Sequence, residues 1–229
     1  MLLERKRKSL ICLTQTITAS AVLIFPMAPV GGLIEPDTPI ICGGKLESGD
    51  KSSECYTLTN RQFVQSETSL KKYNYWNEGS PVVNAALVVI GGGDWGDGKF
   101  KKVSMISPNE FKSLKDMPVG NRGHCTLKLD ENRIMVTGGN SGTRDYDTST
   151  WIYKFDEDVW ESGPPLNHGT SGHACGSFKH QGNIVAMVAT GYGLHTGARF
   201  NILFTNSKFL TFIKWSKIDF YRSKTFRRA

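Results

Sequence analysis

A short apolar run that ends in paired glycines recurs along the chain at nearly even spacing. The pairs are Gly43-Gly44, Gly91-Gly92 and Gly138-Gly139, and a related Gly-Tyr-Gly follows at residues 191–193. The first glycines of successive pairs are 48 and 47 residues apart, and Gly191 lies 53 residues beyond Gly138. The run before each pair is rich in β-branched and aliphatic residues, which favours a strand. Such a period indicates that one supersecondary unit recurs along the chain.

Each unit is expected to hold four strands. A strand and a polar turn precede the run that ends in glycine, as at residues 123–129 and 130–132. A polar loop and a third strand follow the glycines, at 54–59, 102–107 and 150–156, and a fourth strand follows near 63–64, 111–114 and 159–160. Because residues 31–199 show no convincing apolar 3.6-residue period, helices should be scarce. Four strands in a repeat of this length are typical of one blade of a β-propeller.

Stacking of blades explains the residue types at the repeated positions. A four-stranded sheet buries both faces only when neighbouring sheets pack on it. Paired glycines remove side chains near the crowded axis, and they also permit a positive φ. Trp160, at the outer end of its unit, would fill the gap between two blades with a large apolar surface.

The third unit resembles the kelch repeat, through Met117-Pro118, Arg122-Gly123-His124, Gly138-Gly139, Tyr153 and Trp160. The second unit lacks the tryptophan, and the fourth has Gly-Tyr-Gly in place of Gly-Gly. The resemblance covers about residues 31–193 and implies an all-β kelch-type β-propeller of three to four four-stranded blades. The propeller is expected to be incomplete, since closed propellers typically have four to eight blades. The structural repeat positions would be Gly43, Gly44, Gly91, Gly92, Gly138, Gly139, Tyr153 and Trp160.

The two ends of the chain differ from the repeats. Residues 1–30 combine a basic start, an apolar stretch and Ala19-Ser20-Ala21, which has the form of a secretory signal with its cleavage site. The alternatives are a strand of a half-blade, or a membrane anchor, against which Pro26 and the Thr/Gln content argue. Residues 198–229 contain neither Gly nor Pro, and we expect a basic tail outside the repeat. That tail would lie as a strand or helix on the open edge, or contact a membrane surface or anionic partner. The predicted organisation is therefore an N-terminal segment at 1–30, blades at 31–197 and a tail at 198–229.

The basic charge of the chain is concentrated at its ends. The net charge of +7 divides into +3 for residues 1–8, +6 for residues 200–229 and −2 for the residues between them. A nucleic-acid-binding domain would show a basic stripe with interleaved aromatic residues on its own fold, and the repeats show none. We therefore expect no nucleic-acid partner. No run of 18 uncharged apolar residues stands out beyond the first 35 positions, so no membrane span is expected in the mature chain.

The positions of the cysteines suggest disulfides. One expected strand ends at Cys42 and the next begins at Cys55, so a bond across the loop is sterically plausible. Closing so short a loop would contribute about 3 kcal/mol. Cys125 and Cys175 occupy related positions in successive units and could bond across a blade boundary. The alternative is that all four are small buried side chains.

No catalytic, cofactor-binding or metal-binding set of residues is recognisable. His124 and His173 recur at the same repeat position, which indicates a structural role. Gly-x-Ser-x-Gly and phosphate-loop motifs do not occur, and the glycine-rich segment 91–98 is interpreted as a turn because it lacks the Lys-Ser/Thr of a phosphate loop. Galactose oxidase and its relatives build enzymes on kelch-like propellers, but Tyr146, Tyr192 and His195 do not assemble into the copper site that this resemblance would require. We therefore expect neither an enzyme nor a cofactor.

The sequence predicts a non-enzymatic protein-protein interaction module. Stacked blades hold variable loops rigidly, so the partner would bind at loops 45–53, 94–101, 141–149 and 166–171. By residue type, the candidate anchors are Trp95, Arg144 and Tyr146. The signal-like start and the cysteines favour a secreted or extracellular protein. The alternatives are a cytoplasmic substrate adaptor of a ubiquitin ligase or an actin-binding protein, as the kelch resemblance implies, and then a galactose-oxidase-like enzyme.

Overall fold

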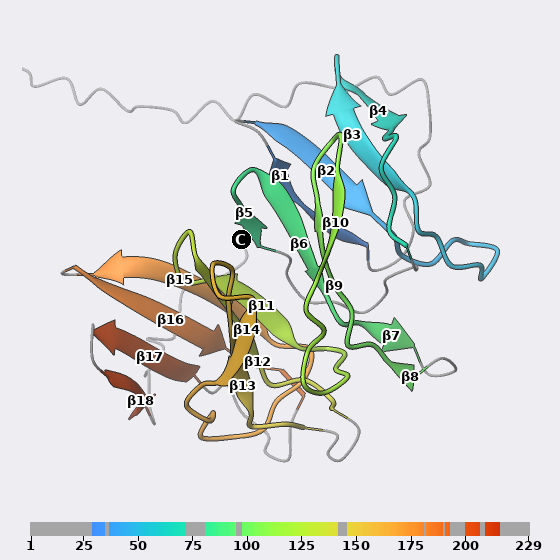
Figure 1. Ribbon diagram of the computed structural model, residues 1–229. Coiled ribbons are helices and arrows are strands. Elements are labelled where there is room, and N and C mark those ends of the chain that lie inside the picture. Colours follow the sequence, from blue (N-terminus) through green and yellow to red (C-terminus); the bar gives the residue numbers. More distant parts are fainter. Residues whose placement is uncertain are drawn as a thin grey trace, which may run out of the picture.

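The computed structural model describes residues 29–34, 37–71, 81–94, 98–141, 146–180, 182–189 and 191–192, with strand backbone at 200–206 and 209–215. The regular elements of this part of the chain are all strands, and they form four four-stranded antiparallel sheets that follow one another along the chain (Figure 1). None of these sheets closes into a barrel. The predicted fold class, an all-β chain of four-stranded blades that does not close, is confirmed in its architecture.

We call the four sheets blades 1 to 4. Blade 1 consists of β1 (Val30–Ile34), β2 (Thr38–Cys42), β3 (Cys55–Thr59) and β4 (Gln62–Gln65). Blade 2 consists of β5 (Val82–Val83), β6 (Ala86–Ile90), β9 (Val103–Ile106) and β10 (Phe111–Leu114), and the hairpin β7 (Gly93–Asp94) and β8 (Gly98–Lys99) projects from its β6–β9 loop. Blade 3 consists of β11 (Cys125–Lys128), β12 (Arg133–Thr137), β13 (Thr150–Lys154) and β14 (Val159–Ser162). Blade 4 consists of β15 (Ala174–His180), β16 (Asn183–Ala189), β17 (Phe200–Asn206) and β18 (Phe209–Trp215).

Blade 4 differs from the expectation for the end of the chain. The segment 198–229 was expected to lie outside the repeat, as a strand or helix on the open edge. Its described part does form strands, but within the fourth unit: residues 200–205 pair with β16, and residues 209–215 pair with 200–206, so β17 and β18 complete a four-stranded sheet. Residues 216–229 lie outside the described residues, and so do residues 1–28, on which the signal-like reading rests. The boundary at residue 30 stays a prediction.

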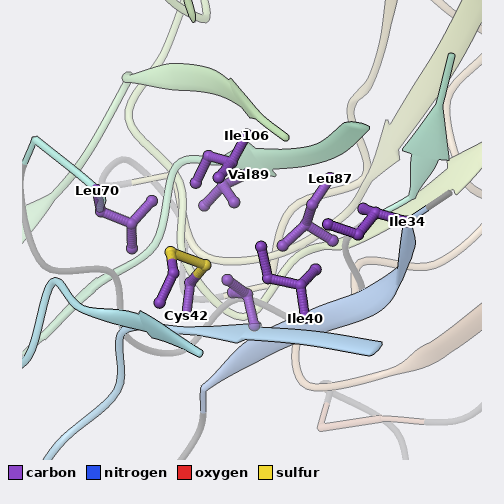
Figure 2. Close-up of a cluster of buried hydrophobic side chains, with 9 residues drawn as sticks. Ile34, Ile40, Cys42, Leu70, Leu87, Val89 and Ile106 are labelled. Atoms are coloured by element: carbon purple, nitrogen blue, oxygen red, sulfur yellow. A yellow bond between two sulfur atoms is a disulfide. The ribbon is translucent and has the colours of Figure 1, made fainter. Parts of the chain in front are cut away.

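The hydrophobic core is divided into clusters that lie between successive blades. The first joins blades 1 and 2, and Figure 2 shows Ile40 and Cys42 of blade 1 opposite Leu87 and Val89 of blade 2. The second joins blades 2 and 3, and the third joins blades 3 and 4. Because successive residues of a strand point to opposite faces, β6 contributes to two clusters at once and is buried along its whole length. This explains why the run before each glycine pair is apolar rather than alternating.

Candidate protein-binding site

The loops predicted to bind a partner gather at one end of the blades. In an up-and-down sheet, the loop between the second and third strands leaves from the same end as the connection to the next blade. The backbone contacts agree: Thr170 N, in the connector between blades 3 and 4, donates to Asp147 O in the β12–β13 loop at 3.2 Å. Ser171, in the same connector, exchanges two backbone hydrogen bonds with Tyr192 beyond β16, at 2.7 and 2.9 Å. We call this end of blades 3 and 4 the loop end.

The paired glycines hold adjacent blades together at the loop end. Gly138 has a φ of +55°, and a Cβ on it would lie 2.6 Å from Thr170 O and 2.9 Å from the His173 ring. The next residue, Gly139, donates from its N to Thr170 O at 2.7 Å. A side chain at residue 138 would therefore push the next blade away.

The same arrangement joins blades 2 and 3. A Cβ on Gly91 would lie 2.8 Å from Asn121 O and 3.0 Å from the His124 ring. Gly92 N donates to that same Asn121 O at 2.9 Å. In blade 1, Gly43 and Gly44 have the same kind of positive φ, at 68° and 98°.

In the fourth unit, Gly191 does not correspond to the glycine with which the sequence spacing aligns it. A Cβ on Gly191 would lie 2.7 Å from the Cβ of His173, just as one on Gly139 would lie 2.8 Å from the Cβ of His124. Gly191 is therefore equivalent to the second glycine of the third pair, and not to Gly138.

The two repeated histidines are buried between the blades that these glycines bring close. His124 and His173 are 0% and 3% exposed. The Nε2 of His173 lies 2.8 Å from the hydroxyl of Thr137, at the end of β12 in the preceding blade. Burial lowers the pKa of His124 to about 3, with a smaller contribution from the nearby His173, and burial lowers the pKa of His173 to about 4. Both rings are neutral at pH 7 and act as packing groups.

Tyr153 and Trp160 fill the outer part of the interface between blades 2 and 3. They pair across β13 and β14 with ring centroids 5.0 Å apart, and both contact the cluster between these blades. Trp160 also donates from Nε1 to Lys115 O at 3.0 Å, which ties it to the connector after blade 2. Burial and a hydrogen bond to Asp158 raise the pKa of Tyr153.

Blade 2 has an equivalent of this pair that sequence reasoning missed. Ile106 and Phe111 pair in the same register and lie on the cluster between blades 1 and 2. The missing tryptophan is thus replaced by a phenylalanine, which lies 20 residues after Gly91, whereas Trp160 lies 22 residues after Gly138, so a search had to allow for a shorter turn.

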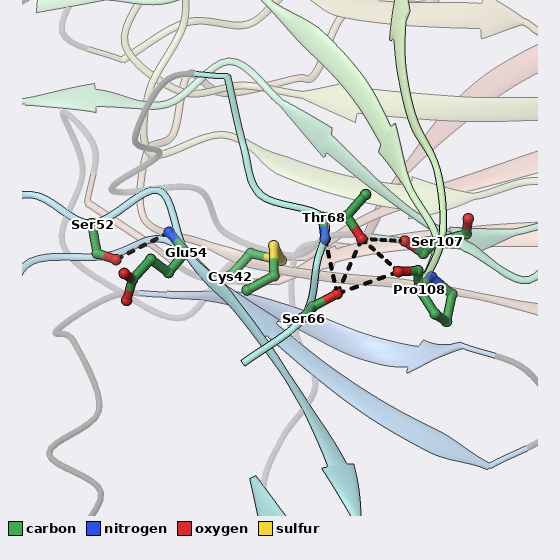
Figure 3. The surroundings of a disulfide bond; sticks show 8 residues. Cys42, Ser52, Glu54, Ser66, Thr68, Ser107 and Pro108 are labelled. Carbon is green, nitrogen blue, oxygen red and sulfur yellow. Dashed lines mark hydrogen bonds between the residues drawn. A yellow bond between two sulfur atoms is a disulfide. The ribbon is translucent and has the colours of Figure 1, made fainter. Parts of the chain in front are cut away.

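Both suggested disulfides are present in the structure. Cys42 and Cys55 are bonded between β2 and β3, with a Cα–Cα distance of 4.0 Å. Figure 3 shows this bond near Ser66 and Thr68, which reach blade 2 through hydrogen bonds such as that from Thr68 Oγ1 to Pro108 O at 2.8 Å. Cys125 and Cys175 are bonded between β11 and β15, with a Cα–Cα distance of 5.9 Å, so this disulfide joins blade 3 to blade 4.

Of the three candidate anchors, only Tyr146 lies within the described residues. Trp95 and Arg144 fall outside them. Tyr146 is half-buried, and its carbonyl packs closely against Gly169, next to the connector residue Thr170. Sequence reasoning missed Tyr192 as an anchor, although it is 75% exposed at the loop end. Nothing in the sequence marks its exposure, because this follows from the pairing with Ser171.

The neighbouring carboxylate supports the loop. Asp147 is 8% exposed and accepts hydrogen bonds from the backbone N and the hydroxyl of Ser149, at 2.9 and 2.5 Å. Burial acts to raise the pKa of Asp147, but the hydrogen bonds from Ser141 and Ser149 outweigh it and lower this pKa. The Asp147 carboxylate therefore fixes the conformation of the β12–β13 loop by accepting these hydrogen bonds.

Within the described residues, no three His, Cys, Asp or Glu side chains are grouped so that they could hold a metal ion. In the same part of the chain, no helix has the length and apolar character needed to cross a membrane.

Comparison with known proteins finds kelch-like relatives. The chain is 34% identical over 94 residues to Kelch-like protein 22 of Rattus norvegicus and 33% identical over 94 residues to Kelch-like protein 22 of Mus musculus. Each match covers 38% of this chain and 15% of the relative, so the chain matches a small part of the relatives' length. No family model matches the chain. Together with the four-stranded antiparallel sheets, this similarity fits a partial kelch-repeat β-propeller.

Proposed function

We propose that the chain is a non-enzymatic module that binds a protein partner at the loop end of its blades, with Tyr192 as the central anchor. The observation that carries the proposal is that a large aromatic side chain, 75% exposed, stands on a backbone fixed by two hydrogen bonds to Ser171. An exposed aromatic on a rigid backbone loses little conformational entropy on binding.

The surroundings of Tyr192 suit a binding surface. The connector 169–171 separates Tyr192 from Tyr146, so two tyrosines flank one short segment. Tyrosines are enriched among the residues that dominate binding energy. The interblade hydrogen bonds and the Cys125–Cys175 disulfide would hold this surface in place before the partner arrives.

We propose an extracellular setting for this activity. Two disulfides favour an oxidising compartment, and the signal-like residues 1–30 agree with it. The N-terminal sequence and the non-reduced mass of the protein from the medium of expressing cells test this setting. A start near Val22 with both disulfides formed is the expected result, whereas protein found only in the lysate, with Met1 and free thiols, contradicts it.

The binding proposal is tested by comparing partner capture between variants. The full chain, Tyr192→Ala and Val64→Ala would each be used to capture proteins from medium, and the affinity of a captured protein would be measured by biolayer interferometry. Val64 is a matched control because it is 50% exposed on β4, the outermost strand of blade 1. We expect Tyr192→Ala to weaken binding about 30-fold, as for a hot-spot residue. Equal affinity of the three proteins would refute the proposed surface.

A further inference from the structure

The outward face of blade 1 is apolar, although none of the described cores includes it. We define this face by Leu33, Pro39, Ile41, Tyr56 and Leu58. The strand register places them together, because Leu33 is paired with Pro39, Ile41 with Tyr56, and alternate residues of each strand share a face. Their neighbours on the other face, such as Val30, Ile40 and Cys55, form the cluster with blade 2. Leu33 is 59% exposed.

The same positions in blades 2 and 3 pack against the preceding blade. The hydrogen bonds Gly43 N to Glu54 O, Gly91 N to Lys102 O and Gly138 N to Ser149 O are equivalent and fix the alignment of the units. Leu58 therefore corresponds to Ile106 and to Tyr153, which lie in the clusters that blades 2 and 3 form with the blade before them. The outward face of blade 1 is thus one half of a blade-to-blade interface.

Blade 4 presents the complementary half. Cys175, Ser177 and Ala186 point toward blade 3, where Cys175 is bonded to Cys125 and Ser177 donates to Lys128 O. Phe178 therefore points away from blade 3, and it is 48% exposed.

Met187 marks the same face as Phe178. It is paired with Gly176 and lies on the face opposite Ala186. The equivalence of Gly191 and Gly139 aligns Met187 with Met135, which packs against blade 4. The position of Met187 is thus one at which a side chain packs against the following blade.

We propose that these two faces bind each other between two copies of the chain, so that blade 4 of one copy packs on the outward face of blade 1 of the other. Each copy carries one example of both halves, and none of the clusters within the described residues joins blade 1 to blade 4. The contact continues the interface that already joins the blades. The four blades within the described residues become eight in two copies, and propellers of up to eight blades close into a ring, so a closed dimer is the expected product.

Sedimentation velocity of the full chain under oxidising conditions tests the proposal. We expect a monomer–dimer equilibrium that depends on concentration in the micromolar range. Leu33→Glu and Phe178→Glu each place a charge on one of the two faces, and each is expected to raise the dissociation constant at least about tenfold, since an unpaired charge buried at an interface is costly. Val64→Glu is the matched control: Val64 is 50% exposed on blade 1 but lies on its other face, and its substitution should leave the equilibrium unchanged.

A mixture of the two face variants distinguishes this contact from other modes of association. Leu33→Glu keeps an intact blade 4 face and Phe178→Glu keeps an intact blade 1 face, so an equimolar mixture should form dimers although each variant alone is largely monomeric. Near-UV circular dichroism verifies that each variant is folded; Leu33→Ala and Phe178→Ala serve in the same scheme if a charged variant is not. A wild-type chain that stays monomeric at about 100 μM, well above a micromolar dissociation constant, overturns the proposal. So does a mixture that forms no dimer, or a Val64→Glu chain as weakened as the other two.

Discussion

Replacement of Gly138 by alanine measures how closely blades 3 and 4 must approach. Two costs are expected. A non-glycine residue at a φ of +55° costs about 1–2 kcal/mol in the left-handed region. In addition, the new Cβ would meet Thr170 O at 2.6 Å and the His173 ring at 2.9 Å, and both lie in the segment that leads into β15 of the next blade.

The cost of the steric clash follows from the contacts that the new Cβ would displace. Moving Thr170 O away weakens the hydrogen bond from Gly139 N, which is 2.7 Å long and contributes about 1 kcal/mol. Displacing a packed histidine adds about 1–3 kcal/mol, the usual cost of overpacking. The free energy of unfolding of Gly138→Ala should therefore fall by about 3–6 kcal/mol in total.

A second glycine separates the two costs. Gly182, in the turn between β15 and β16, has a φ of +77°, and a Cβ there would meet nothing within 4 Å. Gly182→Ala should therefore lose only the backbone cost, about 1–2 kcal/mol. Urea unfolding followed by tryptophan fluorescence, at a protein concentration at which the chain is monomeric, gives both values. If Gly138→Ala is no less stable than Gly182→Ala, the close approach of the blades is not the reason for glycine at residue 138.

Three further predictions concern the same interfaces. Replacing Cys125 and Cys175 together by serine should lower the free energy of unfolding by about 4 kcal/mol on the chain-entropy model, since their separation is 50 residues; an unchanged urea midpoint for the double variant under oxidising conditions would contradict it. As the pH falls from 6.5 to about 4, the unfolded chain binds a proton that the folded His173 excludes, so stability should fall by about 1.4 kcal/mol per pH unit from this group. His173→Gln should remove that part of the slope, and a slope unchanged in the variant would refute the assignment. Trp160→Phe should keep most of the packing but lose the hydrogen bond to Lys115 O, a cost of about 1 kcal/mol, whereas Trp160→Ala should cost about 3 kcal/mol, and equal losses in thermal or urea unfolding would count against this division.

The kelch-type blades could be predicted from the sequence because their signals are local. Each strand, turn and glycine pair lies within one unit, and the spacing of Gly91 and Gly138 shows that the unit recurs. The strand ends at Cys42 and Cys55 could also be found from neighbouring residues, and this made the disulfide across the loop a reasonable hypothesis. The pattern of apolar residues along each strand also indicates whether the strand is buried on one face or on both.

The structure differs from the sequence-based expectation where no local signal marks a strand of the repeat. The absence of glycine and proline from residues 200–215 predicts a segment outside the repeat, yet residues 200–206 and 209–215 form β17 and β18 of the fourth sheet. The place of β17 is determined by hydrogen bonding to β16, a partner more than ten residues away along the chain, and β18 in turn pairs with β17. Pairing of this kind leaves little trace in the composition of the added strands.

By itself, the sequence determined the repeat, most strands of the first three blades and the need for small residues at the glycine pairs. Only the tertiary structure decided which blade faces are covered, why Phe111 can replace a tryptophan, and that Tyr192 stands exposed at the loop end. The physical reason is that strand formation depends on neighbouring residues, whereas burial depends on contacts between units about 50 residues apart. Gly138 belongs to both levels, because its own backbone requires a positive φ and the next blade leaves no room for a side chain.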